Sequence, residues 1–305
     1  MRPAELKGII ATGLLSFPVT DFDRELNFDP WQYAARLEWL MPFGAPELFA
    51  AGGTGEFFSL TPAEYRDVIS IAASTCRGRT PIIAGAGYGT ALAIDYAHEA
   101  ERVGASGILL MPPYLTDMDA TGLREHVLHV CRSTRLGVIV YHRANARFDA
   151  RTLAELAGAC PNLIGFKDGV GDIEAMVTIR AALGDRLVYL GGLPTAEVYA
   201  SAYLAIGVAT YSSAVFNFIP RTALAFHRAV TTGDRAVVDR LLREFFLPYV
   251  AIRNRKPGYA VSIVKAGARI VGKSAGPVRP PLVDLLAEEE DRLKALVLAL
   301  GEAPD

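Results

Sequence analysis

The chain has 305 residues, of which 51% are apolar and 21% are charged, a balance typical of globular proteins. Its net charge of -2 argues against a basic nucleic-acid surface, and no apolar run is long enough to span a membrane. Three scattered cysteines, Cys76, Cys131 and Cys160, favour reduced thiols in a cytoplasmic protein over a disulfide framework.

Short apolar runs that favour β-strands recur along the first two thirds of the chain. Most are continuous rather than alternating, as expected for parallel strands that are buried on both faces. In chain order the predicted strands are 9–15, 48–51, 81–84, 107–111, 137–141, 163–167, 187–190 and 208–211.

Helical patterns lie between the predicted strands. Thr61, Pro62 and Glu64 form a capping box with proline at the first helical position, and Gly104 and Gly184 are C-terminal stops. The predicted helices are 64–73, 91–103, 121–132, 150–159, 173–183 and 195–204.

Eight strands that alternate with helices predict a (β/α)8 TIM barrel, which we place at residues 1–231. A doubly wound sheet is the alternative, but no Gly-rich dinucleotide fingerprint follows the first strand. Beyond Pro220 no strand pattern remains, and we expect a C-terminal helical domain over residues 232–305. Helical patterns cover 223–231, 235–249, 259–271 and 282–300.

The active site of such a barrel lies at the C-terminal ends of its strands, and the sixth strand ends in Lys167. A lysine at the mouth of a core is partly desolvated, so its pKa falls and its neutral amine can form a Schiff base with a ketone. Taken alone, a lysine in this pattern is more often a strand-end lysine that simply reaches water, and the other strand ends reverse that balance. Tyr141 ends the neighbouring strand, where it could move protons as the carbinolamine forms and collapses.

Other strand ends carry residues that suit a bound acid. The second strand leads into residues 52–56 (Gly-Gly-Thr-Gly-Glu), where glycines let backbone N–H groups approach a carboxylate. The other strand ends of this set are 111–114 (Met-Pro-Pro-Tyr), 191–194 (Gly-Gly-Leu-Pro) and 211–213 (Tyr-Ser-Ser). The five histidines form no metal-ligand pattern, so we expect no metal site.

These strand ends together resemble a known enzyme family. The chain is similar to the dihydrodipicolinate synthase / N-acetylneuraminate lyase superfamily, Schiff-base enzymes on a (β/α)8 barrel with a C-terminal helical domain. The family's Gly-x-Thr-Gly-Glu motif matches residues 52–56, its strand-five tyrosine matches Tyr141, and its Schiff-base lysine matches Lys167. The resemblance covers nearly the whole chain.

Within the superfamily, further motifs resemble the 5-dehydro-4-deoxyglucarate dehydratases. They are residues 51–60, 141–145 (Tyr-His-Arg-Ala-Asn), 165–169 (Gly-Phe-Lys-Asp-Gly), 191–197 and 210–214. The resemblance implies a decarboxylating hydro-lyase of D-glucarate and galactarate catabolism, which converts 5-dehydro-4-deoxy-D-glucarate to 2,5-dioxopentanoate, water and carbon dioxide. Lys167 would be the electron sink for both steps, so neither a metal nor an organic cofactor is needed.

The implied substrate is a small keto-acid dianion. We expect its carboxylate beside the ketone to bind the N–H groups of Gly53 and Thr54, and we expect Arg143 to bind its far end. Further expected contacts are Asn145, Gly191, Ser212 and Ser213. The expected catalytic residues are Lys167, Tyr141 and Thr54.

Three positions bear on how far the resemblance extends. Gly53 stands where the synthase has the first threonine of Gly-Thr-Thr-Gly-Glu, a member of its proton relay, while Thr54 matches the second. His142 stands where asparagine is expected in the dehydratase group, which affects fine substrate preference. Tyr114 matches a tyrosine that in the synthase reaches into a neighbouring subunit's site, and the family implies a homotetramer built from two dimers.

Two other functions are alternatives. An aldolase or lyase on the same barrel would make or cleave a pyruvate unit, but Gly53 and the 141–145 run argue against it. A non-catalytic keto-acid sensor would retain the pocket, but the presence of both Lys167 and Tyr141 argues against that role.

Overall fold

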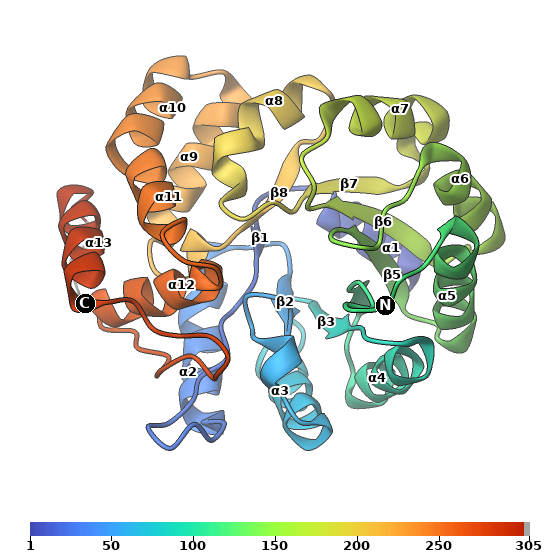
Figure 1. Ribbon diagram of the computed structural model, residues 1–305, viewed down its shortest axis with the longest axis horizontal. Helices are drawn as coiled ribbons and strands as arrows, with labels where there is room; N and C mark the ends of the chain where they lie inside the picture. Colours follow the sequence, from blue (N-terminus) through green and yellow to red (C-terminus); the bar gives the residue numbers. More distant parts are fainter. Residues whose placement is uncertain (302–305) are drawn as a thin grey trace.

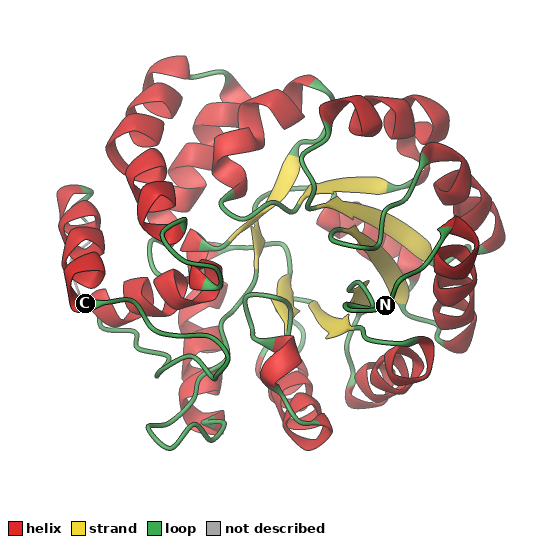
Figure 2. Cartoon of the chain, viewed as in Figure 1, coloured by secondary structure: helices red, strands yellow, loops and turns green. Residues whose placement is uncertain are grey.

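A computed structural model describes residues 1–301 of the chain. Within this range, eight parallel strands pair in chain order, and β8 closes the barrel by pairing with β1. Figure 1 and Figure 2 show the strands at the centre of the molecule with helices around them. The strands are β1 (Leu15–Ser16), β2 (Leu48–Ala50), β3 (Ile82–Ala86), β4 (Gly107–Leu110), β5 (Gly137–His142), β6 (Leu163–Asp168), β7 (Val188–Gly191) and β8 (Thr210–Ser213). The predicted (β/α)8 barrel is confirmed.

Helices follow each strand and cover the outside of the barrel (Figure 1). They are α2 (Pro30–Leu40), α3 (Pro62–Thr75), α4 (Thr90–Val103), α5 (Ala120–Ser133), α6 (Ala150–Ala159), α7 (Ile173–Leu183), α8 (Ala200–Ala205) and α9 (Pro220–Thr232). The bounds of α6 and α7 are those predicted. The prediction missed α2, whose N-cap Asp29 accepts hydrogen bonds from Trp31 N and Gln32 N, and the segment before α8 is a 3-10 turn, Ala196–Tyr199.

The first predicted strand, 9–15, is wrong over most of its length. Ile9 and Ile10 end helix α1 (Pro3–Ile10), which Pro3 can begin because a helix leaves its first N–H groups unpaired. Leu6 and Ile10 are fully buried. A Cβ built on Gly107 at the start of β4 would lie 2.5 Å from Leu6 Cδ2, so α1 packs across the N-terminal end of the barrel. Its apolar residues serve a helix rather than a strand.

The strand register places the site residues side by side. Tyr141 on β5 pairs with Lys167 on β6, and Lys167 pairs in turn with Leu190 on β7. This confirms that Tyr141 and Lys167 lie at adjacent positions near the C-terminal ends of neighbouring strands. Their side chains therefore converge because of register, not because of proximity in sequence.

Further helices follow the barrel and gather on one side of it (Figure 1). They are α10 (Arg235–Leu241), α11 (Leu247–Arg253), α12 (Tyr259–Ile270) and α13 (Ala287–Ala299). A π-helical turn, Leu242–Phe246, interrupts the single helix predicted at 235–249, as expected where Pro248 lacks the N–H that an α-helix needs. The division at residue 232 stays a prediction, and positions 302–305 of that segment lie outside the described residues. Within residues 1–301, no helix combines the length and apolar character needed to cross a membrane.

Candidate active site

Lys167 lies at the C-terminal mouth of the barrel with only 4% of its surface exposed. Its Nζ is 4.2 Å from the ring centroid of Phe17 and 4.1 Å from that of Tyr141. Burial, and secondly the positive charge of Arg143, hold the pKa of Lys167 well below its usual value. A lysine with a lowered pKa carries more neutral amine at neutral pH, and the neutral amine is the nucleophile that attacks a ketone.

A cavity of about 260 Å³ opens in front of this lysine. A pocket of this size suits a small acid rather than a large cofactor. Seven residues expected at the site from the sequence line it: Gly53, Thr54, Tyr114, Tyr141, Arg143, Lys167 and Ser212. The structure thus brings together residues from five different strand ends around one amine.

The Tyr141 hydroxyl is held between two partners. It donates a hydrogen bond to the carbonyl oxygen of Gly192 at 2.7 Å and accepts one from Arg143 Nη1 at 3.1 Å. Burial raises the pKa of Tyr141, an effect that the positive charge of Arg143 opposes. Tyr141 therefore keeps its proton at neutral pH and can lend it to a group bound beside Lys167.

Three residues expected from the sequence to contact the substrate do not line the cavity. Asn145 Nδ2 donates to the carbonyl oxygens of Pro113 at 3.0 Å and Thr116 at 2.7 Å, which ties down the loop after β4. Ser213 is fully buried and donates to Glu197 Oε1 at 2.6 Å. Neither residue lines the cavity, and Gly192 lines it in place of Gly191. Direct substrate contacts by Asn145, Gly191 and Ser213 stay predictions.

A buried ion pair supports the glycine turn after β2. Glu56 Oε1 lies 2.8 Å from Lys265 Nζ on α12, and both side chains are fully buried. Glu56 Oε2 also accepts a hydrogen bond from the backbone N–H of Arg279 at 3.0 Å. The position of Gly53 and Thr54 thus depends on the segment that follows the barrel.

Asp168, the residue after the lysine, shapes its own loop. Its carboxylate accepts hydrogen bonds from Val170 N at 3.0 Å and Gly171 N at 3.1 Å, and from the hydroxyl of Tyr203. These contacts use the carboxylate oxygens within the loop, which agrees with an orienting role for Asp168 rather than proton transfer.

The comparison with protein families decides the family of this chain. The model of the dihydrodipicolinate synthetase family matches residues 10–300. The chain belongs to the dihydrodipicolinate synthetase family. The resemblance that the sequence motifs indicated is therefore confirmed.

Full-length relatives place the chain in one part of this family. It is 64% identical over 301 residues to a probable 5-dehydro-4-deoxyglucarate dehydratase of Leptothrix cholodnii. It is 62% identical over 301 residues to a 5-dehydro-4-deoxyglucarate dehydratase of Pseudomonas putida. Each alignment covers 99% of both chains.

Solved structures of the family share the fold. Dihydrodipicolinate synthase from Oceanobacillus iheyensis has a TM-score of 0.90 at 22% identity, with 98% of this chain and 99% of that chain covered. The synthase from Bacillus clausii has a TM-score of 0.89 at 22% identity, with 97% and 99% covered. At this identity the likeness concerns the barrel and its C-terminal helices.

The sequence did not predict several of the residues that form the pocket around Lys167. Phe17 stacks on Phe49 with ring centroids 4.2 Å apart and covers Lys167 from the β1 side. The helices beyond the barrel supply Tyr249, Arg253 and Val261. No motif marks these positions, and the sequence pattern of 232–305 shows only amphipathic helices, so their approach to Lys167 depends on how those helices pack.

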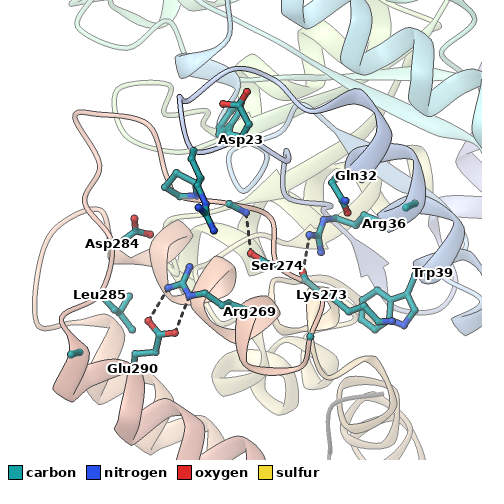
Figure 3. A pocket seen from close by; sticks show the side chains of 17 residues that line it. Asp23, Gln32, Arg36, Trp39, Arg269, Lys273, Ser274, Asp284, Leu285 and Glu290 are labelled. Carbon is teal, nitrogen blue, oxygen red and sulfur yellow. Dashed lines mark hydrogen bonds and ion pairs between the residues drawn. The ribbon is translucent and has the colours of Figure 1, made fainter.

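A larger cleft, of about 1090 Å³, lies between α2 and the helices α12 and α13 (Figure 3). Two of its basic residues are paired: Arg269 lies 2.8 Å from Glu290, and Arg36 lies 2.8 Å from Asp21. Lys167 does not line this cleft. Size alone would favour the cleft, but the chemistry of the lysine assigns the active site to the smaller pocket.

Proposed function

We propose that the protein is a 5-dehydro-4-deoxyglucarate dehydratase, a lyase that converts 5-dehydro-4-deoxy-D-glucarate to 2,5-dioxopentanoate, water and carbon dioxide. The observation that carries the proposal is the buried Lys167, whose pKa is held low at the mouth of the barrel. The relatives that share over 60% of the sequence along the full chain support the same reaction.

The first half of the reaction removes water. The Lys167 amine attacks the C5 ketone, and the carbinolamine loses water to give an iminium. The iminium acidifies C4, and loss of a C4 proton gives an enamine. The enamine electrons then expel the C3 hydroxyl, which takes up a proton and leaves as water, so that a C3=C4 double bond is conjugated with the iminium.

The second half removes carbon dioxide. The bond between C1 and C2 breaks, and its electron pair moves through C3=C4 into the iminium nitrogen while C1 leaves as carbon dioxide. This leaves a dienamine that carries an enol at C2. Protonation at C4 regenerates the iminium, and protonation at C3 with loss of the C2 hydroxyl proton converts the enol to the aldehyde. Hydrolysis of the Schiff base releases 2,5-dioxopentanoate and restores the Lys167 amine.

Tyr141 supplies and recovers protons in these steps. Its hydroxyl is fixed by Gly192 and Arg143, and its ring lies against Lys167. A protonated phenol beside the carbinolamine can protonate the departing hydroxyl, and the phenolate can take back a proton during hydrolysis. Thr54, which lines the same pocket, is the second hydroxyl of the expected catalytic set.

The pocket also suits an acidic substrate. Backbone N–H groups at Gly53 and Thr54 can receive the carboxylate beside the ketone, and Ser212 offers a hydroxyl on the wall of the same cavity. Arg143 adds a guanidinium, which matches a carboxylate in shape and charge. These features support a keto acid as the substrate.

The proposal is tested by proton NMR of the purified protein with 5-dehydro-4-deoxy-D-glucarate. We expect the signals of 2,5-dioxopentanoate or its hydrate, together with release of carbon dioxide. Pyruvate without carbon dioxide would replace the dehydratase with an aldolase on the same lysine. Binding without any turnover would indicate a keto-acid sensor.

The assembly and location belong to the same proposal. We propose a cytoplasmic homotetramer that acts in D-glucarate and galactarate catabolism, with Tyr114 reaching toward a neighbouring subunit's site. Light scattering behind a size-exclusion column measures the mass in solution, and a monomer at micromolar concentration would contradict the tetramer.

A further inference from the structure

Within residues 1–301, the ionisable side chains that line the active-site pocket include cations but no carboxylates. Arg143, Lys167 and Arg253 line it, and none of the described lining residues is a carboxylate. Because Lys167 has a lowered pKa, the two arginines are the permanent cations. By contrast, the buried Arg36 has a carboxylate partner, Asp21 at 2.8 Å. The pocket therefore gains most from a ligand that brings two negative charges.

Arg253 ends helix α11, and neutral acceptors fix its guanidinium. Nη1 donates to the carbonyl oxygen of Pro194 at 2.7 Å and to Thr195 Oγ1 at 2.6 Å. Nε and Nη2 donate to Asn254 Oδ1 at 3.1 Å and 2.9 Å. A guanidinium has five N–H groups, so these four bonds leave one for a ligand. The group is rigidly placed, yet its charge has no anionic hydrogen-bond partner.

The carboxyl group that acts on Arg253 is Glu197, behind the pocket wall. Burial raises the pKa of Glu197 to about 7, and its Oε1 accepts the hydroxyl of Ser213. Glu197 is thus partly protonated at neutral pH and compensates the charge of Arg253 only in part. Burial also lowers the pKa of Arg253, as expected for a cation that a bound carboxylate would stabilise.

The two arginines have different neighbours in the pocket. Arg143 touches the Tyr141 hydroxyl at 3.1 Å, and its charge lowers the pKa of Lys167. Arg253 instead contacts Pro194 and Thr195 in the loop after β7. The proposed substrate matches this arrangement, because one of its carboxylates adjoins the ketone and the other lies at the far end of the carbon chain.

We propose that Arg253 is the specificity-determining residue for the carboxylate farthest from the ketone, and that Arg143 serves the keto end. This inference rests on the proposed function and names its substrate class: six-carbon 2-keto acids with a second, terminal carboxylate. It reassigns the far-end role that the sequence suggested for Arg143. It also gives the C-terminal helices a direct part in substrate recognition.

The test compares two ligands in wild-type and variant proteins. The first is 5-dehydro-4-deoxy-D-glucarate, and the second is the analogue in which a hydroxymethyl group replaces the far carboxylate. The yield of borohydride-trapped Schiff base, followed by intact-protein mass spectrometry over a range of ligand concentrations, gives an apparent affinity for each. We expect the wild type to prefer the dianion by at least about 30-fold, as for a desolvated charge pair, and R253Q to reduce this ratio to near one.

The variants separate recognition of charge from a structural role. R253Q retains an amide that can donate to Pro194, whereas R253K retains the charge and should keep an intermediate preference. If Arg253 only held the loop after β7, R253Q would weaken both ligands equally, and that result would overturn the inference. Should R253Q fail to fold, the wild-type ratio decides, because equal affinity of the wild type for both ligands would do the same.

The outcome also distinguishes this inference from the proposed function. A wild-type protein that gives no borohydride adduct with either ligand would refute the Schiff-base reaction and with it the role of Arg253. An adduct that forms with both ligands at equal affinity in the wild type would leave the Schiff base intact and refute only the role of Arg253.

Discussion

Gly192 lies so close to the side chain of Lys167 that position 192 has no room for a side chain of its own. A Cβ built on Gly192 would be 2.6 Å from Cγ and 2.7 Å from Cε of Lys167, and 2.8 Å from the carbonyl oxygen of Asp168. The same Gly192 carbonyl accepts the Tyr141 hydroxyl. One glycine after β7 therefore leaves room for the amine and also fixes the phenol beside it.

Gly192→Ala should displace the lysine side chain and lower kcat/KM on the order of 10²-fold, the cost of a displacement of about 1 Å at a reacting group. Steady-state kinetics measures this effect. Gly158→Ala on α6 is the matched control, since a Cβ there meets nothing within 4 Å. Equal activity of the two variants would show that Lys167 does not need the space that Gly192 leaves.

Lys167→Ala should abolish turnover because no other lysine lines the pocket among the described residues. Intact-protein mass spectrometry after borohydride reduction with substrate should show an adduct on the wild type and none on the variant. Lys294→Ala, at an exposed position on α13, is the control and should form the adduct normally. An adduct on Lys167→Ala would place the Schiff base elsewhere.

Tyr141→Phe should slow turnover by about 10² to 10⁴-fold, the usual contribution of one general acid–base group. Substrate binding should change less, because the ring that packs on Lys167 is retained. Tyr189→Phe, which loses a hydrogen bond to the Gly184 carbonyl away from the pocket, is the control. A kcat for Tyr141→Phe within a few-fold of the wild type would assign the proton transfers to another group.

The rate of Schiff-base formation should rise with pH through the lowered pKa of Lys167, since the neutral amine reacts. Arg143→Gln removes a positive charge that disfavours the ammonium form of Lys167. The pKa of Lys167 should therefore rise, and the increase in the rate of Schiff-base formation should occur at higher pH. Stopped-flow measurement with a saturating keto acid gives the midpoint independently of affinity. A midpoint that stays in place would mean that burial alone sets this pKa.

Glu56→Gln should destabilise the protein by roughly 3–5 kcal/mol, the typical cost of leaving one buried charge without its partner, here Lys265. Urea denaturation measures the change in the free energy of unfolding. The double variant Glu56→Gln, Lys265→Met removes both charges and should recover part of the loss. If the double variant were no more stable than Glu56→Gln alone, the unpaired lysine would not be the source of the loss.

Much of the fold could be predicted because its signals are local. The capping box at Thr61 and the glycine stop after Val103 mark helix ends through their own backbone chemistry, and α3 and α4 end within two residues of the predictions. The run at 9–15 was misread because an apolar segment fits either a strand or a buried helix. Only the packing of this segment across the N-terminal end of the barrel shows that it is a helix rather than a strand.

The sequence by itself determined the barrel, the family motifs and the reactive lysine, because buried parallel strands and their ends leave a pattern that repeats along the chain. The tertiary structure decided what surrounds the lysine. Arg253 is 86 positions away from Lys167 in the numbering, yet it lines the same cavity, and Gly192 becomes critical only through the register of β6 with β7. Contacts between distant segments depend on how whole helices and strands pack, and no local pattern encodes them.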